Sequence, residues 1–155
     1  MTESVETPEP DPRFWETKSL DAMTPGEWEQ LCDGCGRCCL HKLEDADSGE
    51  VWYTSVACRL LDLYHCRCRD YEHRLARVPD CLPLYPDTVA NADWLPRTCA
   101  YRLLAEGRSL MWWHPLISED RDTVHHAGIS IRDRGLPEDD VDTGDLEPYI
   151  LPVGF

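Results

Sequence analysis

The sequence predicts a small, irregular α+β fold that consists of short helices and one small hairpin. The chain has 155 residues, of which 42% are hydrophobic, so it can bury one core but not two. Its helix signals are brief and are interrupted by proline or glycine. One pair of segments has the composition of two strands joined by a polar turn. We therefore expect a single domain.

The acidic residues are concentrated at both ends of the sequence. The formal net charge is −15. Residues 1–12 hold four acidic side chains and residues 138–155 hold six, with no Lys or Arg in either segment. We predict an acidic N-terminal tail at 1–12, one cysteine-rich domain at 13–137 and an acidic C-terminal tail at 138–155. The composition of the last segment favours an extended or disordered chain.

This charge balance argues against nucleic acid as a partner, because a duplex backbone attracts a dense basic face. We expect no membrane partner, since no stretch approaches the roughly 18 apolar residues of a spanning helix. The N-terminus lacks the basic and apolar regions of a secretory signal. The sequence therefore predicts a cytoplasmic protein, and its acidic tails and aromatic residues indicate a protein partner.

Three short helices are expected from capping residues. Thr24 and Glu27 form a capping box around Pro25. Asp70 and Asp93 each precede a run with helical spacing. The predicted helices cover residues 25–31, 71–78 and 94–107, and the last of them carries Cys99.

A loop and three strand patterns complete the expected elements. Residues 32–39 contain Gly34 and Gly36, which makes a regular helix improbable and a tight loop the expected structure. The segments 40–43 and 51–57 flank a polar turn and should form the hairpin, and residues 128–132 alternate like an edge strand.

Nine cysteines are the main chemical signal in the sequence. A reducing compartment makes disulfides rare, so metal binding or redox chemistry is the usual reason for such a density. The domain at 13–137 is therefore predicted to bind metal. The candidate ligands are Cys32, Cys35, Cys38, Cys39, Cys58, Cys66, Cys68, Cys81 and Cys99.

The cysteines fall into an early loop and a later group. Spacing of the form C-x2-C-x2-C lets Cys32, Cys35 and Cys38 aim three thiolates at one point. Cys39 diverges from Cys38, so it belongs to an adjacent centre or is a bystander. The later group of Cys58, Cys66, Cys68 and Cys81 should supply the remaining ligands, and the total number allows two centres. The helical register of Cys99 is equally compatible with a ligand and with an inert, buried thiol.

The spacing favours an iron-sulfur cluster slightly over zinc. Structural zinc sites usually show two C-x2-C knuckles, whereas the later group here shows C-x7-C-x-C. Three cysteines with gaps of two residues and a distant fourth are closer to an iron-sulfur loop. Zinc, alone or in a thiolate-bridged cluster, stays open as the alternative.

The same residues resemble the YcgN family of bacterial cysteine-cluster proteins, within the zinc- or iron-chelating CxxxCxxCC domain group. The resemblance spans about residues 13–117 and rests on five stretches: CDGCGRCC at 32–39, ACR at 57–59, CRCRDYE at 66–72, PDC at 79–81 and WLPRTCAYRLLAEG at 94–107. It implies that eight cysteines chelate metal: Cys32, Cys35, Cys38, Cys39, Cys58, Cys66, Cys68 and Cys81. The first gap here is two residues, where the name of the group has three.

Three functions are compatible with such a centre. The first is a metal-bearing accessory protein or electron-transfer unit that also needs its metal to fold. The second is a metal-dependent enzyme for redox or methyl-group chemistry, by analogy with a module found in flagellin lysine methylases. The third is a zinc-stapled protein-interaction module. No pattern in the sequence identifies catalytic residues, and His114 is expected to be a packed ring rather than a base.

Overall fold

The computed structural model describes residues 13–79, 81, 84–91 and 94–152, and it confirms a small α+β fold. The α-helices of this part of the chain have four to six residues each: α1 Phe14–Thr17, α2 Pro25–Gln30, α3 Arg74–Arg77, α4 Pro86–Val89, α5 Ala100–Ala105, α6 Pro115–Ser118 and α7 Thr123–His126. The strands are β1 Leu40–Glu44, β2 Val51–Ala57, β3 Leu61–Asp62, β4 Arg67–Cys68 and β5 Leu136–Pro137. The 3-10 helices are η1 Leu20–Ala22, η2 Arg37–Cys39, η3 Glu138–Asp140 and η4 Glu147–Tyr149.

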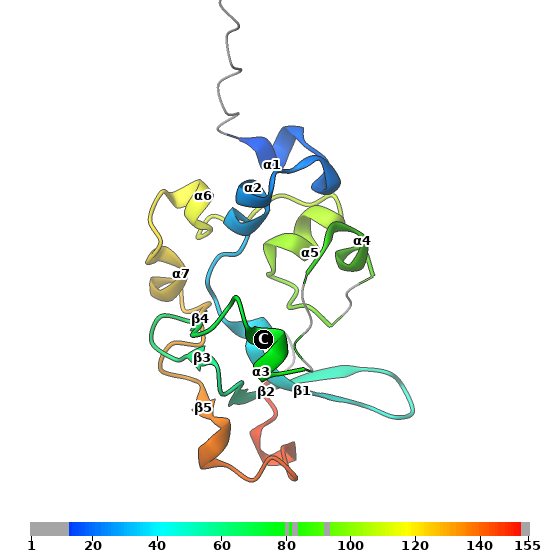
Figure 1. The fold of residues 1–155 in the computed structure, drawn as a ribbon, viewed down its shortest axis with the longest axis vertical. Coiled ribbons are helices and arrows are strands. Elements are labelled where there is room, and N and C mark those ends of the chain that lie inside the picture. Colours follow the sequence, from blue (N-terminus) through cyan, green and yellow to red (C-terminus); the bar gives the residue numbers. More distant parts are fainter. Residues whose placement is uncertain (1–12, 80, 82–83, 92–93, 153–155) are drawn as a thin grey trace, which may run out of the picture.

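Helices and strands gather at opposite ends of the molecule. Figure 1 shows α1, α2, α4, α5 and α6 at one end, and the strands together with α3 at the other. The segment that follows α2 runs from the helical end to the strand end, and the turn of the β1–β2 hairpin extends beyond the body. The early cysteines therefore lie on a connection between the two ends.

The predicted hairpin is confirmed, and β2 is the central strand of a three-stranded sheet. β1 pairs with it in antiparallel fashion, with Leu40 opposite Ala57 and an irregularity between Leu40 and Lys42. β5 pairs with the other edge of β2 in parallel. A separate two-stranded sheet places Leu61 of β3 opposite Cys68 of β4.

Residues near the C-terminus return to the central strand. Ile150 forms an antiparallel bridge with Thr54, and the N–H of Leu151 donates to the carbonyl of Tyr53 at 2.8 Å. Leu146 is buried. These contacts differ from the extended or disordered chain that the charge indicated, because a few apolar residues between the acids find partners on the sheet.

The capping box of α2 is confirmed. The N–H of Glu27 donates to Oγ1 of Thr24 at 3.2 Å, and the N–H of Thr24 donates to Oε1 of Glu27 at 2.9 Å. Lys18 adds a bond from its ammonium to the same carboxylate, at 2.8 Å. The helix ends at Gln30, and the side chain of the next residue, Leu31, is completely buried. This end fixes where the cysteine loop begins.

Two predicted helices are shorter than expected. Asp70 does not cap α3; its carboxylate bonds instead to the ring of His73 at 2.9 Å, and the helix covers only Arg74–Arg77. The prediction that Cys99 lies on a helix was wrong, because α5 begins one residue later and Cys99 has extended backbone. The predicted cap, Asp93, lies outside the described residues.

The edge strand predicted at 128–132 is also wrong. These residues form turns and irregular backbone. The N–H of Ile131 donates to the carbonyl of Cys35 at 2.9 Å, so this segment packs against the cysteine loop instead of against a strand. The side chain of Ile131 is 1% exposed. The alternating apolar residues of this segment are therefore buried in a turn and not in a strand.

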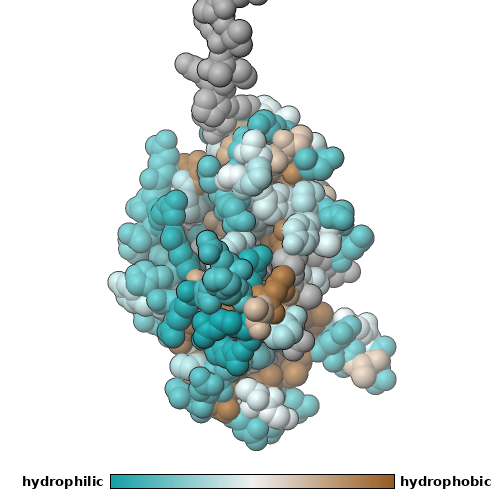
Figure 2. All heavy atoms as spheres, viewed as in Figure 1, coloured by the Kyte–Doolittle hydropathy of each residue, from teal (hydrophilic) through white to brown (hydrophobic). Residues whose placement is uncertain are grey.

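The core consists of three hydrophobic clusters, and each contacts cysteines. The buried members of the first are Phe14, Trp15, Leu31, Val89, Leu95 and Tyr101. Those of the second are Leu40, Ala57, Leu61, Cys66 and Ile131, and those of the third are Cys35, Trp113 and Val124. The face drawn in Figure 2 is mostly hydrophilic. Within the described residues, the helices are too short and too polar to cross a bilayer.

Candidate metal centre

The early cysteines lie on a loop that two glycines allow to turn. Gly34 and Gly36 have φ of 77° and 75°, a left-handed conformation that favours glycine. Between them, the N–H of Cys35 donates to Oδ1 of the buried Asp33 at 3.0 Å. The N–H of Arg37 then points to the sulfur of Cys35 at 3.5 Å. The predicted turning loop is therefore present, and bonds from its backbone N–H groups to its own side chains hold it.

Cys38 and Cys39 end this loop and contact each other through their side chains. The hydrogen bond from Cys39 lowers the pKa of the Cys38 thiol, and the same bond, together with burial, raises the pKa of the Cys39 thiol. Of the two residues, Cys38 is therefore the one whose thiolate is favoured. A metal that binds either sulfur would change the charge that the other one faces.

Cys99 lies beside the early loop, although it is about sixty residues later in the chain. Cys38 and Cys99 both pack against the first hydrophobic cluster. Burial raises the pKa of the Cys99 thiol to about 12, and the charge of Cys38 adds to this rise. Burial, followed by the charge of Cys38, also raises the pKa of Cys32. Cys32 reaches the surface, but the protein that surrounds it on the other sides still disfavours its thiolate.

Among the later cysteines, Cys58 adjoins Cys39, and Cys81 lies near Cys58, Cys68 and Cys38. The N–H of Cys58 donates to the carbonyl of Cys39 at 2.9 Å, where β1 and β2 meet. β4 brings Cys68 back beside β3, which begins three residues after Cys58. The guanidinium of Arg59 bonds to the carbonyl of Arg77 and thereby holds the end of α3, just before Cys81, next to Cys58. Burial raises the pKa of the Cys81 thiol, and the charges of Cys58 and Cys68 contribute.

Cys66 has different surroundings. It is 4% exposed within the second hydrophobic cluster and has φ of 58°, which is uncommon for a residue with a side chain. Its thiol points to the carbonyl of Leu63, at 3.9 Å from the sulfur. Burial raises its pKa, while Ser130 and Arg132 lower it. No other cysteine is among the main influences on this thiol.

Lys42 is a charged residue at the site that the sequence analysis missed. Its ammonium donates to the carbonyls of Cys38 and Leu40 at 2.7 and 2.9 Å. It also lies over the rings of Tyr53 and Trp94, at 5.2 and 5.5 Å from their centroids. Burial lowers its pKa, and the charges of Cys38, Cys39, Cys81 and Cys58 raise it. One feature of the sequence could have drawn attention to Lys42: lysine is rare in this chain, and Lys18 is the only other one.

The donor chemistry of the site fits zinc or iron, because thiolates bind both. Next to Cys99, the hydroxyl of Thr98 is buried and has no hydrogen-bond partner among the described residues. A metal-bound thiolate or sulfide is an acceptor of the kind that this hydroxyl lacks. Among the same residues, no three His, Cys, Asp or Glu side chains are arranged to hold an ion. Metal binding therefore requires the cysteine side chains to turn toward a common point.

The two histidines nearest the cysteines have other partners. Nε2 of His41 lies 2.5 Å from Oε2 of Glu138, and Nδ1 of His65 lies 3.1 Å from Oδ2 of Asp62. His114 is a packed ring, as predicted: it is 2% exposed, and its Nε2 donates to the carbonyl of Leu31 at 2.8 Å. Sulfur is therefore the main donor type near the loop.

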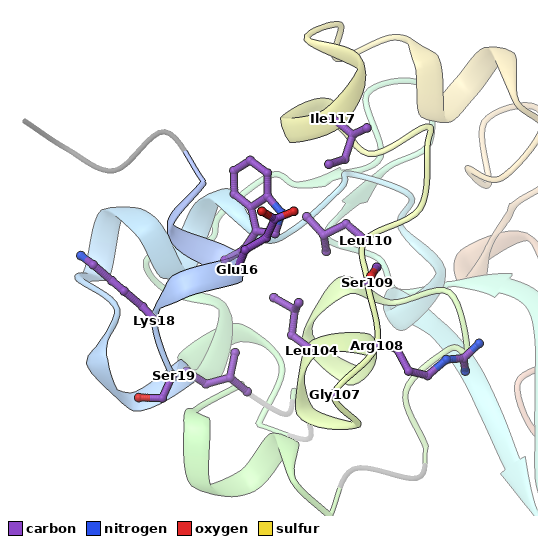
Figure 3. A pocket seen from close by; sticks show the side chains of 11 residues that line it. Glu16, Lys18, Ser19, Leu104, Gly107, Arg108, Ser109, Leu110 and Ile117 are labelled. Carbon is purple, nitrogen blue, oxygen red and sulfur yellow. The ribbon is translucent and has the colours of Figure 1, made fainter.

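One cavity of about 460 Å³ lies at the helical end, away from the cysteines. Figure 3 shows Leu104, Leu110 and Ile117 around it, across from Glu16 of α1. Its lining includes the charged Lys18 and Arg108 but no cysteine. The cavity is therefore separate from the candidate metal centre.

Comparison with known proteins agrees with the chemistry of this region. Residues 31–100 match the CxxCxxCC family, described as "Putative zinc- or iron-chelating domain". The first gap in that name has two residues, as in this chain, so the difference of one residue noted from the sequence disappears. The matched residues include all nine cysteines.

Relatives in several bacteria match over most of the chain. The UPF0260 protein of Sinorhizobium medicae is 59% identical over 89% of this chain and 89% of its own length. The one from Allorhizobium ampelinum is 60% identical over 88% of this chain and 86% of the relative. The one from Nitrobacter hamburgensis is 54% identical over 97% of this chain and 89% of the relative. No solved structure matches the chain. With these identities and coverages, the chain belongs to the UPF0260 family.

Proposed function

We propose that the protein binds metal through cysteine thiolates and acts as a metal-bearing accessory or electron-transfer protein. The observation that supports this most directly is the gathering of thiols from distant parts of the chain. Cys38 and Cys39 contact each other, Cys58 adjoins Cys39, and Cys99 packs beside Cys38. Leucine or valine would fill the same space equally well, so packing alone does not explain such a concentration of desolvated thiols.

The electrostatics of these thiols favour a bound cation. Burial raises the pKa of Cys32, Cys35 and Cys99 above the ordinary value, because a thiolate without a counter-charge is costly in a desolvated site. A metal ion replaces the protons and supplies that counter-charge. Lys42 adds a positive charge beside four other sulfurs, those of Cys38, Cys39, Cys58 and Cys81. The site is thus suited to exchange protons for metal.

The donor set favours an iron-sulfur cluster over zinc in the early loop. Cys32, Cys35 and Cys38 have gaps of two residues, and the fourth sulfur nearby comes from the distant Cys99. This spacing is typical of cluster loops. A cluster would supply a one-electron redox centre, and a zinc ion would supply a structural cross-link. In either case the loop orients the thiolates, and the buried Asp33 and Lys42 set the charge around them.

Anaerobic purification of the full chain tests this proposal. We expect stoichiometric metal by elemental analysis. Equal amounts of iron and acid-labile sulfide with a brown colour would support the cluster, whereas colourless protein with zinc would support the structural alternative. Cys38→Ser should lower the metal content, and Ser55→Ala on the hairpin is a matched control. Protein without metal in which nine thiols titrate freely would contradict metal binding itself.

A further inference from the structure

We propose that the protein forms a two-fold symmetric dimer in which a strip of arginines on one copy binds a strip of acidic residues on the other. This goes beyond the proposed metal binding and does not depend on it. The basic strip consists of Arg59, Arg67, Arg69, Arg74, Arg77 and Arg132. The acidic strip consists of Glu138, Asp139, Asp140, Asp142, Asp145 and Glu147.

The basic strip is built by the β3–β4 sheet, α3 and one nearby turn. The guanidinium of Arg59 bonds to the carbonyl of Arg77 in α3. That of Arg132 donates to the carbonyl of Tyr64, between β3 and β4, at 2.6 Å. The exposed Arg67 begins β4. Figure 2 shows strongly hydrophilic residues gathered over α3 and the adjoining strands, so arginines from separate elements share one surface.

Several of these arginines keep donors for another chain. Arg67 and Arg69 are exposed and form no ion pair among the described residues. Arg74 lies over the ring of Tyr71, at 3.9 Å from its centroid. A guanidinium that is held flat in this way still presents N–H groups to a carboxylate.

The acidic strip adjoins the basic strip at Glu138. Oε1 of this residue accepts the N–H of Arg59 at 3.0 Å, and Oε2 faces His41. The acidic strip then continues through η3 toward η4, in the orange segment after β5 in Figure 1. Asp139 and Asp140 are exposed and form no ion pair within the described part of the chain. Both strips therefore keep charges that their own copy leaves uncompensated.

The neighbouring position of the two strips fits a two-fold axis. When opposite charges lie side by side on one copy, a half-turn about an axis between them places each strip against the other strip of the second copy. The same contact then forms twice. The net charge of −15 opposes association at long range. Physiological salt screens charges over about 8 Å, so the local pairs dominate at the contact.

Exposed apolar side chains accompany both strips. Tyr64, Tyr71 and Leu75 lie among the arginines and are 62%, 49% and 45% exposed. Leu136 and Ile150 flank the acidic strip and are 40% and 38% exposed. Tyrosine and arginine are enriched in protein interfaces, whereas lysine is depleted, and the basic strip contains no lysine. Its composition is therefore that of a protein interface.

The charge pattern favours a second copy over nucleic acid. A phosphate backbone attracts an uninterrupted basic face, whereas Asp62, Asp70 and Glu72 are interspersed among the arginines. The adjoining acidic strip would also repel phosphates. A second copy supplies the complementary pattern, because residues 138–147 contain six acids and no Lys or Arg.

Sedimentation velocity of the full chain under reducing, anaerobic conditions tests the dimer. At about 0.1 M salt, where charges are screened over about 10 Å, the mass should be twice the 17.8 kDa of one chain. At about 1 M salt the screening length falls to about 3 Å, and the dimer should dissociate. A monomer under the first condition, or a dimer that persists under the second, would overturn the proposal.

Charge reversal locates the contact. Arg67→Glu/Arg69→Glu should weaken the dimer about 10-fold or more, because both symmetric contacts lose several ion pairs. Arg97→Glu/Arg121→Glu is the matched control: it changes the net charge equally, at exposed arginines outside the basic strip, and should keep the dimer. Equal weakening in the two variants would show that net charge, and not the basic strip, controls association.

Mixing two reversed variants gives a result that misfolding cannot imitate. Asp139→Arg/Asp140→Arg should be monomeric by itself. Mixed with Arg67→Glu/Arg69→Glu, it should form a heterodimer, because both contacts again join opposite charges. A mixture that stays monomeric, although each variant has the circular dichroism of the wild type, would contradict the pairing of the strips. A monomeric wild type that binds a labelled single-stranded oligonucleotide would assign the basic strip to nucleic acid instead.

Discussion

The ammonium of Lys42 donates a hydrogen bond to the carbonyl of Cys38 at 2.7 Å, which places a half-buried positive charge beside the candidate metal centre. We expect Lys42→Met to weaken metal binding roughly 10- to 100-fold, because outer-shell partners of metal ligands typically contribute that much. Competition with a chromophoric chelator would measure the change. Lys18→Met removes the other lysine, which pairs with Glu27, and should leave metal affinity as it is. Equal metal affinity in the Lys42→Met and Lys18→Met variants would show that Lys42 does not stabilise the bound metal.

Gly36 and Gly34 offer a matched pair of substitutions in the early loop. Both have positive φ, so alanine at either position should cost about 1–2 kcal/mol. At Gly36 the added Cβ would also lie 2.8 Å from Cγ1 of Ile131, whereas nothing lies within 4 Å of the one at Gly34. Gly36→Ala should therefore lower the free energy of unfolding clearly more than Gly34→Ala. Chemical denaturation of both variants would measure it, and equal losses would contradict the close approach of Ile131.

The hydroxyl of Thr98 has no hydrogen-bond partner among the described residues, so we expect its removal to affect metal-free and metal-loaded protein differently. Thr98→Val removes a buried polar group without a partner, so the metal-free form should gain about 1 kcal/mol in stability. The loaded form should gain less or lose stability, because the hydroxyl then has a sulfur acceptor. Thermal unfolding before and after chelation would show the difference. The same gain in both forms would mean that this hydroxyl does not face the metal.

We expect the burial of His114 to make the folded protein less stable in mild acid. Burial lowers the pKa of its ring below the ordinary value of 6.5, so the unfolded chain takes up a proton that the folded chain resists. The stability that depends on the neutral ring is present above pH 6.5 and is lost progressively as the pH falls below it. His114→Gln should flatten this part of the stability curve, measured by denaturation between pH 5 and 8, and His126→Gln serves as the control. A slope that persists in His114→Gln would point to another group.

Local features of the fold were predictable, whereas the contacts among the cysteines were not. The capping box of Thr24 and Glu27 depends on two residues that are three positions apart. The hairpin depends on two neighbouring segments, so both elements are visible within a short stretch of sequence. Cys99 has a helical register, but its backbone is extended because α5 starts one residue later. Whether a cysteine joins Cys38 or Cys39 depends on contacts between distant elements. No spacing in the sequence contains that information.

The return of the chain to β2 has a consequence for the order in which the protein folds while it is synthesised. Ile150 and β5 cover the second edge of the central strand, and both follow the last cysteine by more than thirty residues. Every thiol therefore emerges from the ribosome before the segment that closes the sheet. A metal that binds during translation would bind while the second edge of β2 is still uncovered. The segment that contains the acidic residues would pack against the hairpin only afterwards.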